Sequence, residues 1–435
     1  MTKKKIKFID LFAGLGGTRI GFENACRKHN LEAECVFTSE IKEYAVQAYK
    51  KNFGDEVSGD ITKIPASEIP DFDFLLAGFP CQPFSSAGNR NGFLDTRGTL
   101  FFEIEKILSE KKPEGFLLEN VEGLVNHDKV DKSKKVGRTL ETIIKKLETL
   151  GYNVDWRLID SSLHGVPQKR KRVYIVGRKS KPLSLDNFHQ SKATVGSILE
   201  NGLELMDTKF TKILLKHFEI SDLYGKSVKD KRGGSNNIHS WDIEIKGPTS
   251  NTQRKILSKL LRERRKKQWA EIKGITWMDG MPLTLDEITT FIKDIDRDLL
   301  KMELDDLVKK GYLVFEHPKE VAEIPHESGG VLKVRQYATE KEKGYNIVAG
   351  KLSFEISKIL DPNDVAPTLV ATDVTRLAVP DGNGLRRMTV REGLRLFGFP
   401  ENYELGNIKY TEAFDLLGNT VVIPIIEMVS ERLLD

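Results

Sequence analysis

Cys81 is the side chain of this sequence whose chemistry is easiest to foresee. It follows the apolar stretch "FDFLLAGFP" and opens the segment "CQPFSSAG", which is rich in small residues. Ligands bind at the carboxyl ends of strands in open α/β sheets, and a cysteine thiolate there is a strong nucleophile. A buried structural thiol is the competing interpretation of a lone cysteine. Pro80 and Pro83, with the polar, glycine-containing loop of residues 82–99, favour an accessible thiol under a loop that can close.

Polar side chains also mark two other strand ends. They are Glu119 and Asn120 in "LLENVEGL", and Gln168, Arg170 and Arg172 in "HGVPQKRKRVYIVG". Side chains alternate along a strand, so Arg170 and Arg172 are expected on the same face. A carboxyl group at Glu119 could stand beside Cys81 on the neighbouring strand. A solvated surface charge is the alternative for each of these residues.

A glycine-rich segment near the N-terminus has the character of a cofactor loop. In "DLFAGLGGTRIGFE" the glycines follow a strand and open a helix, which lets a ligand approach the backbone. The spacing is not GxGxxG, which argues against a dinucleotide, and a tight strand-to-helix turn is the bland alternative. Glu40, at the end of the second strand, could accept hydrogen bonds from ribose hydroxyls, and Asp60 could accept one from an adenine amino group. Together they favour a nucleoside cofactor without a phosphate chain.

The elements that would hold these residues alternate between strand and helix over the first 180 residues. Apolar runs such as "KFIDLF", "FDFLLAGFP" and "GFLLENV" are typical of buried strands, and amphipathic stretches separate them. "NVDWRLID" and "RVYIVGR" are expected to pair at one edge. The pattern predicts an α/β fold whose doubly wound, mainly parallel sheet has helices on both faces.

This alternation stops near residue 180 and returns near residue 386. We therefore expect a catalytic domain at 1–180, an inserted domain at 181–385, and C-terminal helices at 386–435 that return to the catalytic domain. "TVREGLRLFGFP" and "EAFDLLGNTVVIPIIEMVSERLL" are the expected helices, the second broken at its Gly-Asn turn. Sequence patterns in the inserted domain are mixed and turn-rich.

Three segments of the insertion have features of nucleic-acid contact. "RKILSKLLRERRKK" predicts a basic amphipathic helix, which suits phosphate contact, although a solvated basic face explains it as well. "RGGSNNIHSWD" offers Arg232, Asn236, Asn237 and His239, and arginine and asparagine suit guanine and adenine edges. Residues 283–340 have the order of a winged helix-turn-helix. Its second helix, "RDLLKMELDDLVKKG", balances four basic against four acidic side chains, so we expect it to pack on protein rather than read bases.

Composition narrows the protein class further. The chain has 435 residues, 39% of them hydrophobic, and a formal net charge of only +4, so any polyanion site must come from local clustering. Its three cysteines form no CxxC pair, which argues against a disulfide framework or a zinc site, and no metal is expected. Neither a signal peptide nor an apolar run long enough for a membrane helix is evident. We expect a cytoplasmic protein without a membrane partner.

The motifs, taken in order, resemble those of the DNA (cytosine-5)-methyltransferases of bacterial type II restriction-modification systems. The matching segments are "DLFAGLGG", "GFPCQPFS", "ENVEGL", "GVPQKRKR", "RRMTVREGLRLFGFP" and "GNTVVIP". They cover about 180 N-terminal and 50 C-terminal residues, and "APTLVATD" supplies a Thr-Leu pair near the end of the variable region. Thr420 stands where many members have serine, which keeps the hydroxyl.

The resemblance implies a mechanism and roles for the residues. Cys81 would attack carbon 6 of a flipped-out cytosine, Glu119 would hold or protonate N3, and Arg172 would steady the ring oxygen and Glu119, with Asn120, Arg170 and Gln82 in support. S-adenosylmethionine would be the methyl donor, bound by Phe12, Gly14, Leu15, Gly16, Gly17, Glu40, Ile41, Asp60, Ile61, Pro80, Leu100, Asn419 and Val421. The expected contacts with double-stranded DNA are Ser85, Arg97, Arg232, Asn236, Asn237 and Thr368.

Two other functions stay open at this point. A tRNA-directed relative would have the same catalytic motifs, although the long insertion here favours DNA. A catalytically inactive nucleic-acid-binding protein is disfavoured by the intact Cys81, Glu119 and Arg172. A cognate restriction endonuclease and a monomeric state are further expectations, while no pattern predicts the DNA site.

Overall fold

The computed structural model describes most of the chain. It covers residues 3–435 except 80–99, 130–132, 134, 231–233, 235, 277–279, 326–330, 349–353 and 371–373. The predicted roles of Pro80, Cys81, Gln82, Ser85, Arg97 and Arg232 therefore concern positions outside the described residues.

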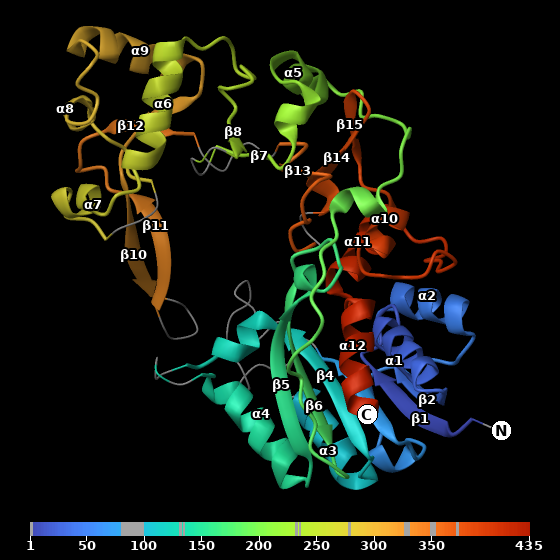
Figure 1. The fold of residues 1–435 in the computed structure, drawn as a ribbon. Coiled ribbons are helices and arrows are strands. Elements are labelled where there is room, and N and C mark those ends of the chain that lie inside the picture. Colours follow the sequence, from blue (N-terminus) through green and yellow to red (C-terminus); the bar gives the residue numbers. More distant parts are fainter. Residues whose placement is uncertain are drawn as a thin grey trace. The chain divides into compact units, whose positions relative to one another are not determined.

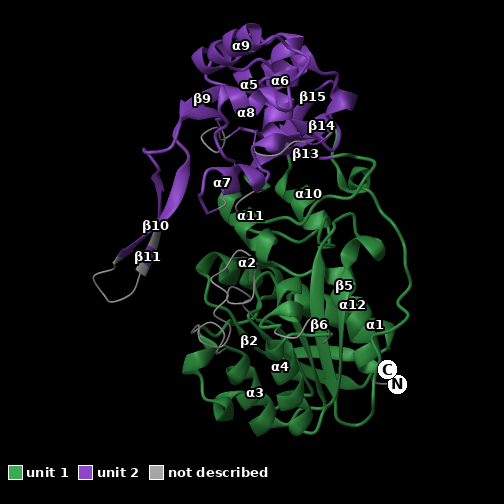
Figure 2. Cartoon of the chain, turned by 90° about the vertical axis from the view of Figure 1, so that its left-hand side faces the viewer, with its two compact units in different colours: residues 1–201, 361–375, 388–435 green, residues 202–360, 376–387 purple. Residues whose placement is uncertain are grey.

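The chain forms two compact units (Figure 2). Unit 1 comprises Met1–Asn201, Asp361–Thr375 and Met388–Asp435, and unit 2 comprises Gly202–Leu360 and Arg376–Arg387. The expected boundaries at residues 180 and 385 differ from this division in two ways. Unit 1 continues to Asn201, and the short segment Asp361–Thr375 returns to unit 1, where Ala366 pairs with Gln168.

Unit 1 is built on a six-stranded sheet (Figure 1), which confirms the predicted α/β fold. β3 and β4 are parallel to β1, while β6 runs antiparallel to β4 and β5 antiparallel to β6 at the edge, as the sequence predicted for that pair. In spatial order the strands are β2 (Glu32–Ser39), β1 (Lys5–Leu11), β3 (Phe74–Gly78), β4 (Gly115–Val121), β6 (Lys171–Arg178) and β5 (Asn153–Asp160).

Helices cover both faces of this sheet. On one face, apolar side chains of the strands pack against α3 (Leu100–Lys111) and α4 (Arg138–Thr149) in one continuous core. On the other face, Phe22 of α1 (Gly17–Lys28) packs on Phe8 and Phe74 of the strands, with ring centroids 5.0 and 5.5 Å apart. The C-terminal helix α12 (Ile423–Leu434) lies along α1, so the last residues of the chain complete the first domain, as predicted.

One stretch, Tyr410–Leu434, is long and apolar enough by length and composition to cross a membrane, although the sequence predicted none. In the fold it is divided into α11 (Tyr410–Asn419) and α12, and 67% of its apolar window is buried within the protein. The division falls at Thr420–Val422, just after the expected Gly-Asn turn. Its hydropathy is therefore that of a pair of core helices.

Unit 2 has two hydrophobic cores. The first lies around a small sheet of the order β15-β14-β13-β7-β8 and helix α5 (Lys209–His217). The second lies between helices α6 (Asn251–Glu263), α7 (Gln268–Ile272), α8 (Leu285–Thr289) and α9 (Arg297–Lys309). The five strands of the small sheet are β7 (Ser227–Val228), β8 (Asn237–Ile238), β13 (Lys358–Ile359), β14 (Leu377–Asp381) and β15 (Gly384–Arg387).

The second core has the element order of a winged helix. After α6, Leu283 bridges to Tyr345, then α8 and α9 precede β9 (Leu313–Glu316), the hairpin β10 (Lys319–Pro325) and β11 (Val331–Tyr337), and finally β12 (Gly344–Ile347). β12 pairs with β9, and the hairpin stands in the position of a wing. This order begins at α6, earlier than the expected residue 283, because α6 supplies Ile256, Leu257 and Leu260 to the same core.

Candidate active site

Glu119 and Arg172 form an ion pair at the carboxyl end of β4. The neighbouring antiparallel strand β6 places Arg172 opposite Val121, and Arg172 Nε lies 3.1 Å from Glu119 Oε1. Both side chains are largely buried, with exposed fractions of 10% and 14%. Burial raises the pKa of Glu119 above its usual range, although Arg172 and Arg170 act in the opposite direction. A carboxyl group in this position can hold a proton that it would lose in water.

The backbone that leads to Cys81 is fixed by Asn120. β3 and β4 run parallel with Gly78 opposite Glu119, so the chain leaves β3 beside this carboxyl group. The buried Asn120 donates from Nδ2 to the carbonyl of Phe79 at 3.1 Å, while its Oδ1 accepts from Val121 N at 2.9 Å. Phe79 is the last described residue before Cys81. The ends of β3 and β4 are therefore adjacent as far as Phe79, as the sequence predicted. The position of the Cys81 thiol itself stays a prediction.

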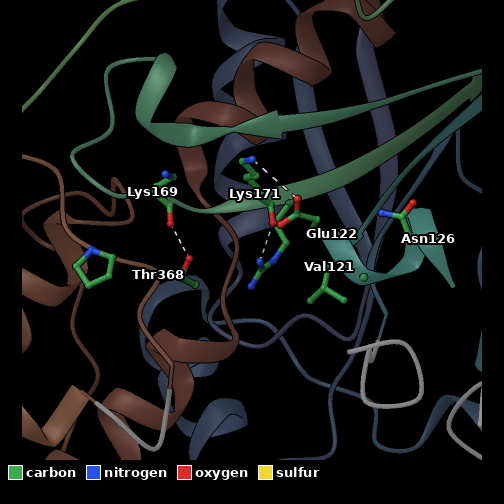
Figure 3. Close-up of a pocket in the computed structure, with 9 residues that line it drawn as sticks. Val121, Glu122, Asn126, Lys169, Lys171 and Thr368 are labelled. Carbon is green, nitrogen blue, oxygen red and sulfur yellow. Dashed lines mark hydrogen bonds and ion pairs between the residues drawn. The ribbon is translucent and has the colours of Figure 1, made fainter. Parts of the chain in front are cut away.

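Beside the ion pair lies a cavity of about 620 Å³ within unit 1 (Figure 3). Lys171 extends toward Glu122, with Nζ 3.9 Å from Oε1, and Thr368 Oγ1 donates to the carbonyl of Lys169 at 2.6 Å. The cavity is lined by Val121, Glu122, Gly123, Asn126, Lys169, Lys171, Arg172, Pro367 and Thr368. Thr368, a predicted DNA contact, thus lies near Arg172, although almost two hundred residues separate them in the sequence.

Arg170 is buried and makes hydrogen bonds to three backbone carbonyls. Its guanidinium donates to the backbone carbonyls of Leu369, Gly418 and Thr420. The carbonyls belong to the segment of Thr368 and to the turn that holds Asn419. Arg170 therefore attaches two distant backbone segments to the start of β6, while its supporting role in catalysis stays a prediction.

The N-terminal loop places Glu40 next to the glycines. Glu40 Oε2 accepts from Gly14 N at 2.8 Å, and Oε1 accepts from the amides of Ile41 and Lys42 at 2.8 and 2.9 Å. Gly14 has φ of 52°, and a Cβ built there meets no atom within 4 Å, so the loop faces open space. Phe12 has φ of 56°, which is uncommon for a bulky residue and is found most often at functional sites.

Ile41 and Ile61 differ in what they offer a cofactor. Ile41 is 74% exposed beside Glu40, an unusual position for a large apolar side chain. Ile61 is buried in the core of unit 1, so only its backbone could contact a ligand. Asp60 caps the short helix that follows, because its Oδ1 accepts from Thr62 N and Oγ1. These hydrogen bonds lower the pKa of Asp60 and keep it ionised.

The remaining predicted cofactor residues lie around the start of α1 and the end of α11. A Cβ on Gly17 would come within 2.8 Å of Val421 Cγ2, so glycine allows α1 to begin against the 420–421 turn. Asn419 is exposed, and its Nδ2 donates to Asp415 O and Oδ1 at 2.8 and 3.2 Å. Leu15 is buried, Gly16 has φ of 70°, and Leu100 is partly buried at the start of α3.

Asp415 is a residue that motif reasoning missed. Its Oδ2 accepts from Lys42 Nζ at 2.8 Å and from Tyr44 Oη at 2.5 Å, and its Oδ1 accepts from Asn419. It thereby connects the loop after Glu40 to the turn of Asn419. The sequence did hold a clue to Asp415. It lies four residues before Asn419, and residues four apart share one face of a helix. Glu122 and Asn126 of the cavity were not singled out either, although Glu122 lies within the quoted "ENVEGL" motif and Asn126 lies two residues beyond it.

The candidate base-contacting loop of unit 2 is only partly suited to that role. Asn236 is exposed and Asn237 is half-buried in β8. His239 is buried, stacks on Trp241 with ring centroids 4.5 Å apart, and has its Nδ1 3.0 Å from Asp242 Oδ2. This packing corrects the expectation for His239, whose ring is used within unit 2.

The basic helix α6 is largely neutralised by acidic neighbours. Arg254 pairs with Glu244 at 2.9 Å, and both Lys255 and Lys259 pair with Asp294. The side chain of Arg264, just after the helix, is buried and donates to Asn346 Oδ1 at 2.7 Å. Of the two interpretations of this segment, the pairing favours a solvated face with internal ion pairs over a phosphate-binding surface.

Comparison with known proteins agrees with the geometry of unit 1. The family model of C-5 cytosine-specific DNA methylases matches residues 6–435. The chain is 57% identical over 434 residues to the type II methyltransferase M.NlaIV of Neisseria lactamica and 56% identical over 434 residues to M.NgoBV of Neisseria gonorrhoeae, in each case over 99% of both chains. It is 42% identical over 456 residues to M.BanI of Aneurinibacillus aneurinilyticus, over 99% of this chain and 96% of that one.

Two solved structures share the fold at low sequence identity. The Entamoeba histolytica methyltransferase EhMeth has a TM-score of 0.54 at 16% identity, over 100% of this chain and 99% of that one. A DNA modification methyltransferase encoded within an E. coli prophage has a TM-score of 0.52 at 20% identity, over 99% and 98% of the two chains.

Proposed function

The chain belongs to the C-5 cytosine-specific DNA methylase family, and from this membership we propose that unit 1 binds S-adenosylmethionine and a flipped-out cytosine and joins them through Cys81. The protein is a DNA (cytosine-5-)-methyltransferase of the type II kind, consistent with methylation in a restriction-modification system. The residue roles, the cofactor and the recognition contacts that follow are part of the proposal.

The proposed reaction begins with attack of the Cys81 thiolate on carbon 6 of cytosine. Electron density moves to N3, where protonated Glu119 donates its proton, and the ring becomes an enamine with a nucleophilic carbon 5. Carbon 5 would then take the methyl group of S-adenosylmethionine, and the electron pair of the broken carbon–sulfur bond would stay on the sulfur of the departing S-adenosylhomocysteine. Loss of the carbon 5 proton to a base expels the Cys81 thiolate, and return of the N3 proton to Glu119 completes the aromatic, neutral ring. The raised pKa of Glu119 supports its role as proton donor.

Arg172 is proposed to perform two tasks at once. Its Nε already lies 3.1 Å from Glu119, and other donors of the guanidinium fork can reach the cytosine ring oxygen. This pairing fixes the carboxyl group beside the base and favours the correct orientation of its proton. Asn120 supports the same geometry, because it holds the Phe79 carbonyl two residues before Cys81.

The residues of the N-terminal loop fit a nucleoside cofactor. The Glu40 carboxylate is held by three backbone amides and keeps lone pairs for ribose hydroxyls. Ile41 offers an exposed apolar surface for an adenine ring, and the open space in front of Gly14 admits a ligand. Phe12, Asp60 and Asn419 complete the proposed set, with the amino group of adenine assigned to Asp60 and the methionine end to Asn419.

The cavity beside Arg172 is proposed to receive the strand that bears the target nucleotide. A cytosine stacked in a duplex cannot reach the active site, so it must be extruded. Lys169 and Lys171 line this cavity together with the hydroxyl-bearing Thr368, and such groups suit backbone phosphates. Arg232, Asn236 and Asn237 of unit 2 are proposed to contact the bases of the site.

The Glu119–Arg172 pair beside the end of β3 is the observation that carries this proposal. Incubation with methyl-labelled S-adenosylmethionine and either duplex DNA or tRNA tests it directly. We expect label at carbon 5 of cytosine in DNA, and bisulfite sequencing of DNA from cells that express the protein would map the site. Label in tRNA alone would contradict the proposal. A protein that binds DNA without transferring label would favour the inactive alternative.

Three further expectations belong to this proposal. A restriction endonuclease that cleaves the same site, a monomeric state and a cytoplasmic location suit an enzyme of bacterial type that acts on DNA. Light scattering of the purified protein, alone and with DNA, would test the monomeric state. Protection of the mapped site against a nuclease from the same cells would test the endonuclease partner.

A further inference from the structure

Arg170 connects two segments that lie far from it and from each other in the sequence. Its Nη2 donates to the carbonyls of Gly418 at 3.1 Å and Thr420 at 2.7 Å, and its Nη1 donates to the carbonyl of Leu369 at 3.4 Å. The side chain is only 3% exposed, and its guanidinium lies over the ring of Phe397, 5.2 Å from the centroid. Such charge-assisted hydrogen bonds in a buried setting are strong and directional.

The two segments belong to different substrates in the proposed function. Gly418 and Thr420 flank Asn419, which is assigned to the methionine end of the cofactor. Leu369 follows Thr368, which lines the cavity assigned to the target strand. One guanidinium therefore holds the backbone of both binding elements.

The segment that contains Leu369 also makes hydrogen bonds to the chain before β6. Ala366 N donates to Pro167 O and Lys169 N donates to Ala366 O, both at 2.8 Å. Thr368 Oγ1 adds its bond to Lys169 O. In the sequence, Asp361–Thr375 joins the two stretches of unit 2, Gly202–Leu360 and Arg376–Arg387.

We propose that Arg170 is a positioning residue that couples cofactor binding to binding of the target DNA strand. This inference rests on the proposed function. The guanidinium fork is planar and always charged, so a ligand that fixes the 418–420 turn also fixes Leu369 and, through it, Thr368. Strand β6 extends this restraint to the catalytic ion pair, because Arg172 lies two residues beyond Arg170 and pairs with Glu119. Lysine could satisfy only one segment at a time, since its ammonium is a point charge on a flexible stem.

The test is a coupling measurement on the full chain. DNA affinity is measured by fluorescence anisotropy of a labelled duplex that carries the mapped site, with and without saturating S-adenosylhomocysteine, the demethylated cofactor. We expect this ligand to tighten DNA binding about fivefold or more in the unaltered protein, within the usual range of coupling between sites. Arg170→Lys and Arg170→Met should reduce the ratio toward one. Linkage requires the same ratio when cofactor affinity is measured with and without DNA.

Arg178 provides a matched control. It lies at the other end of β6, where its Nε pairs with Glu114 at 3.0 Å and its Nη1 donates to the carbonyl of Leu433 at 2.9 Å. Arg178→Met removes a comparable clamp between a strand and a distant carbonyl. It should cost stability while it leaves the coupling ratio unchanged.

Each outcome decides the proposal. A ratio that stays at the original value in both Arg170 variants would overturn it, even if both affinities fell, because a purely structural role weakens binding without uncoupling the sites. A ratio near one in the unaltered protein would also overturn it. If Arg170→Met does not fold, Arg170→Lys with an intact circular dichroism spectrum decides. Failure of the unaltered protein to methylate DNA would count against the proposed function instead, and the ratio is measured independently of methyl transfer.

Discussion

Charged side chains serve different ends in the two compact units. In unit 1, Arg170 and Arg172 are withdrawn from solvent and bind specific carbonyl and carboxylate oxygens next to a cavity. In unit 2, Lys259 of α6 is partly exposed and pairs with Asp294 at 3.2 Å, and Lys301 of α9 is exposed and pairs with Asp305 at 2.6 Å. Exposed pairs of this kind stabilise by about 0–1 kcal/mol.

The difference shows why a run of basic residues in the sequence does not by itself predict a phosphate-binding surface. A basic run in α6 looks like a phosphate-binding surface until Glu244 and Asp294 are brought beside it by the fold. The arginines of "QKRKR" look like a solvated charge run until β6 places them against the carboxyl end of β4. The fold decides which cations remain available to a ligand, and that decision depends on residues distant in the sequence.

The largest effect on the rate of methyl transfer is expected from Glu119→Gln. This substitution tests whether the buried charged groups of unit 1 take part in catalysis. The substitution keeps the shape of the side chain but removes the proton donor, so we expect kcat to fall about 10²- to 10⁴-fold with DNA affinity nearly unchanged. Single-turnover methyl transfer measures the effect. Asp305→Asn on the surface of α9 is the control and should keep full activity. A Glu119→Gln enzyme within about tenfold of the unaltered rate would remove the proton-donor role.

The pH dependence of the reaction sharpens the same point. Because Glu119 must carry a proton, the rate should fall as pH rises through its raised pKa. Arg172 lowers the pKa of Glu119, so Arg172→Met should move this alkaline limb to higher pH while the maximal rate drops. Profiles of kcat/KM against pH for the two proteins give the answer. An alkaline limb that moves to lower pH in Arg172→Met, or stays in place, would contradict the role of protonated Glu119 as proton donor.

Two carboxyl groups, Asp10 in unit 1 and Asp305 in unit 2, should make folding stability depend on pH with opposite sign. Burial raises the pKa of Asp10 to about 7, against a partial effect of its hydrogen bond from Thr18. The folded state therefore holds a proton that the unfolded chain loses near pH 3.8, and stability from this source is lost as pH rises through about 7. Asp10→Asn should lessen that loss by a few kcal/mol, on the order expected from 1.4 kcal/mol per pKa unit.

Asp305 supplies the contrast for that experiment. Hydrogen bonds from Lys301 and Tyr345 lower its pKa, so its contribution is present at neutral pH and lost as the pH falls through the lowered value. Urea unfolding of Asp10→Asn and Asp305→Asn at acidic and at mildly alkaline pH measures the free energy of unfolding of each variant. If Asp10→Asn changed stability equally at the two pH values, the buried, protonated state of Asp10 would be wrong.

The smallest effects are expected from single lysines, and they compare the two units most closely. Lys171→Ala removes a cation that lines the cavity, so DNA affinity should fall and the slope of log affinity against log salt should decrease by about one. Lys301→Ala on α9 should leave both quantities unchanged, because Asp305 already neutralises it. Equal losses for the two variants would show that α9 contacts phosphate and would break the comparison.

Much of the catalytic arrangement could be predicted because strands obey simple rules. Apolar runs identified β3, β4 and β6, and the rule that ligands meet carboxyl ends placed Glu119 near the end of β3. Alternation predicts Arg170 and Arg172 on one face, and this stays a prediction because Arg170 lies just before β6. The motif order then limited the chemistry to one family, which the comparisons show.

The features that could not be predicted depend on long-range contacts that no sequence motif indicates. Arg170 binds backbone carbonyls, which every residue possesses, in segments some two hundred residues away. The return of Asp361–Thr375 to unit 1 follows from backbone pairing, and no composition shift marks its ends. His239 was expected on a loop that contacts bases, whereas its ring stacks on Trp241 and its Nδ1 lies 3.0 Å from Asp242 Oδ2.

The central claim is that the nucleophile is Cys81, held near Glu119 and Arg172. Duplex DNA with fluorine at carbon 5 of the target cytosine, incubated with S-adenosylmethionine, tests it most directly. After methyl transfer carbon 5 has fluorine in place of the proton that must leave, so the covalent adduct accumulates. Peptide mass spectrometry of the trapped complex should find the modified base on Cys81 alone, and Cys81→Ser should form no adduct. An adduct on Cys26 or Cys35, or an adduct that persists in Cys81→Ser, would contradict this account.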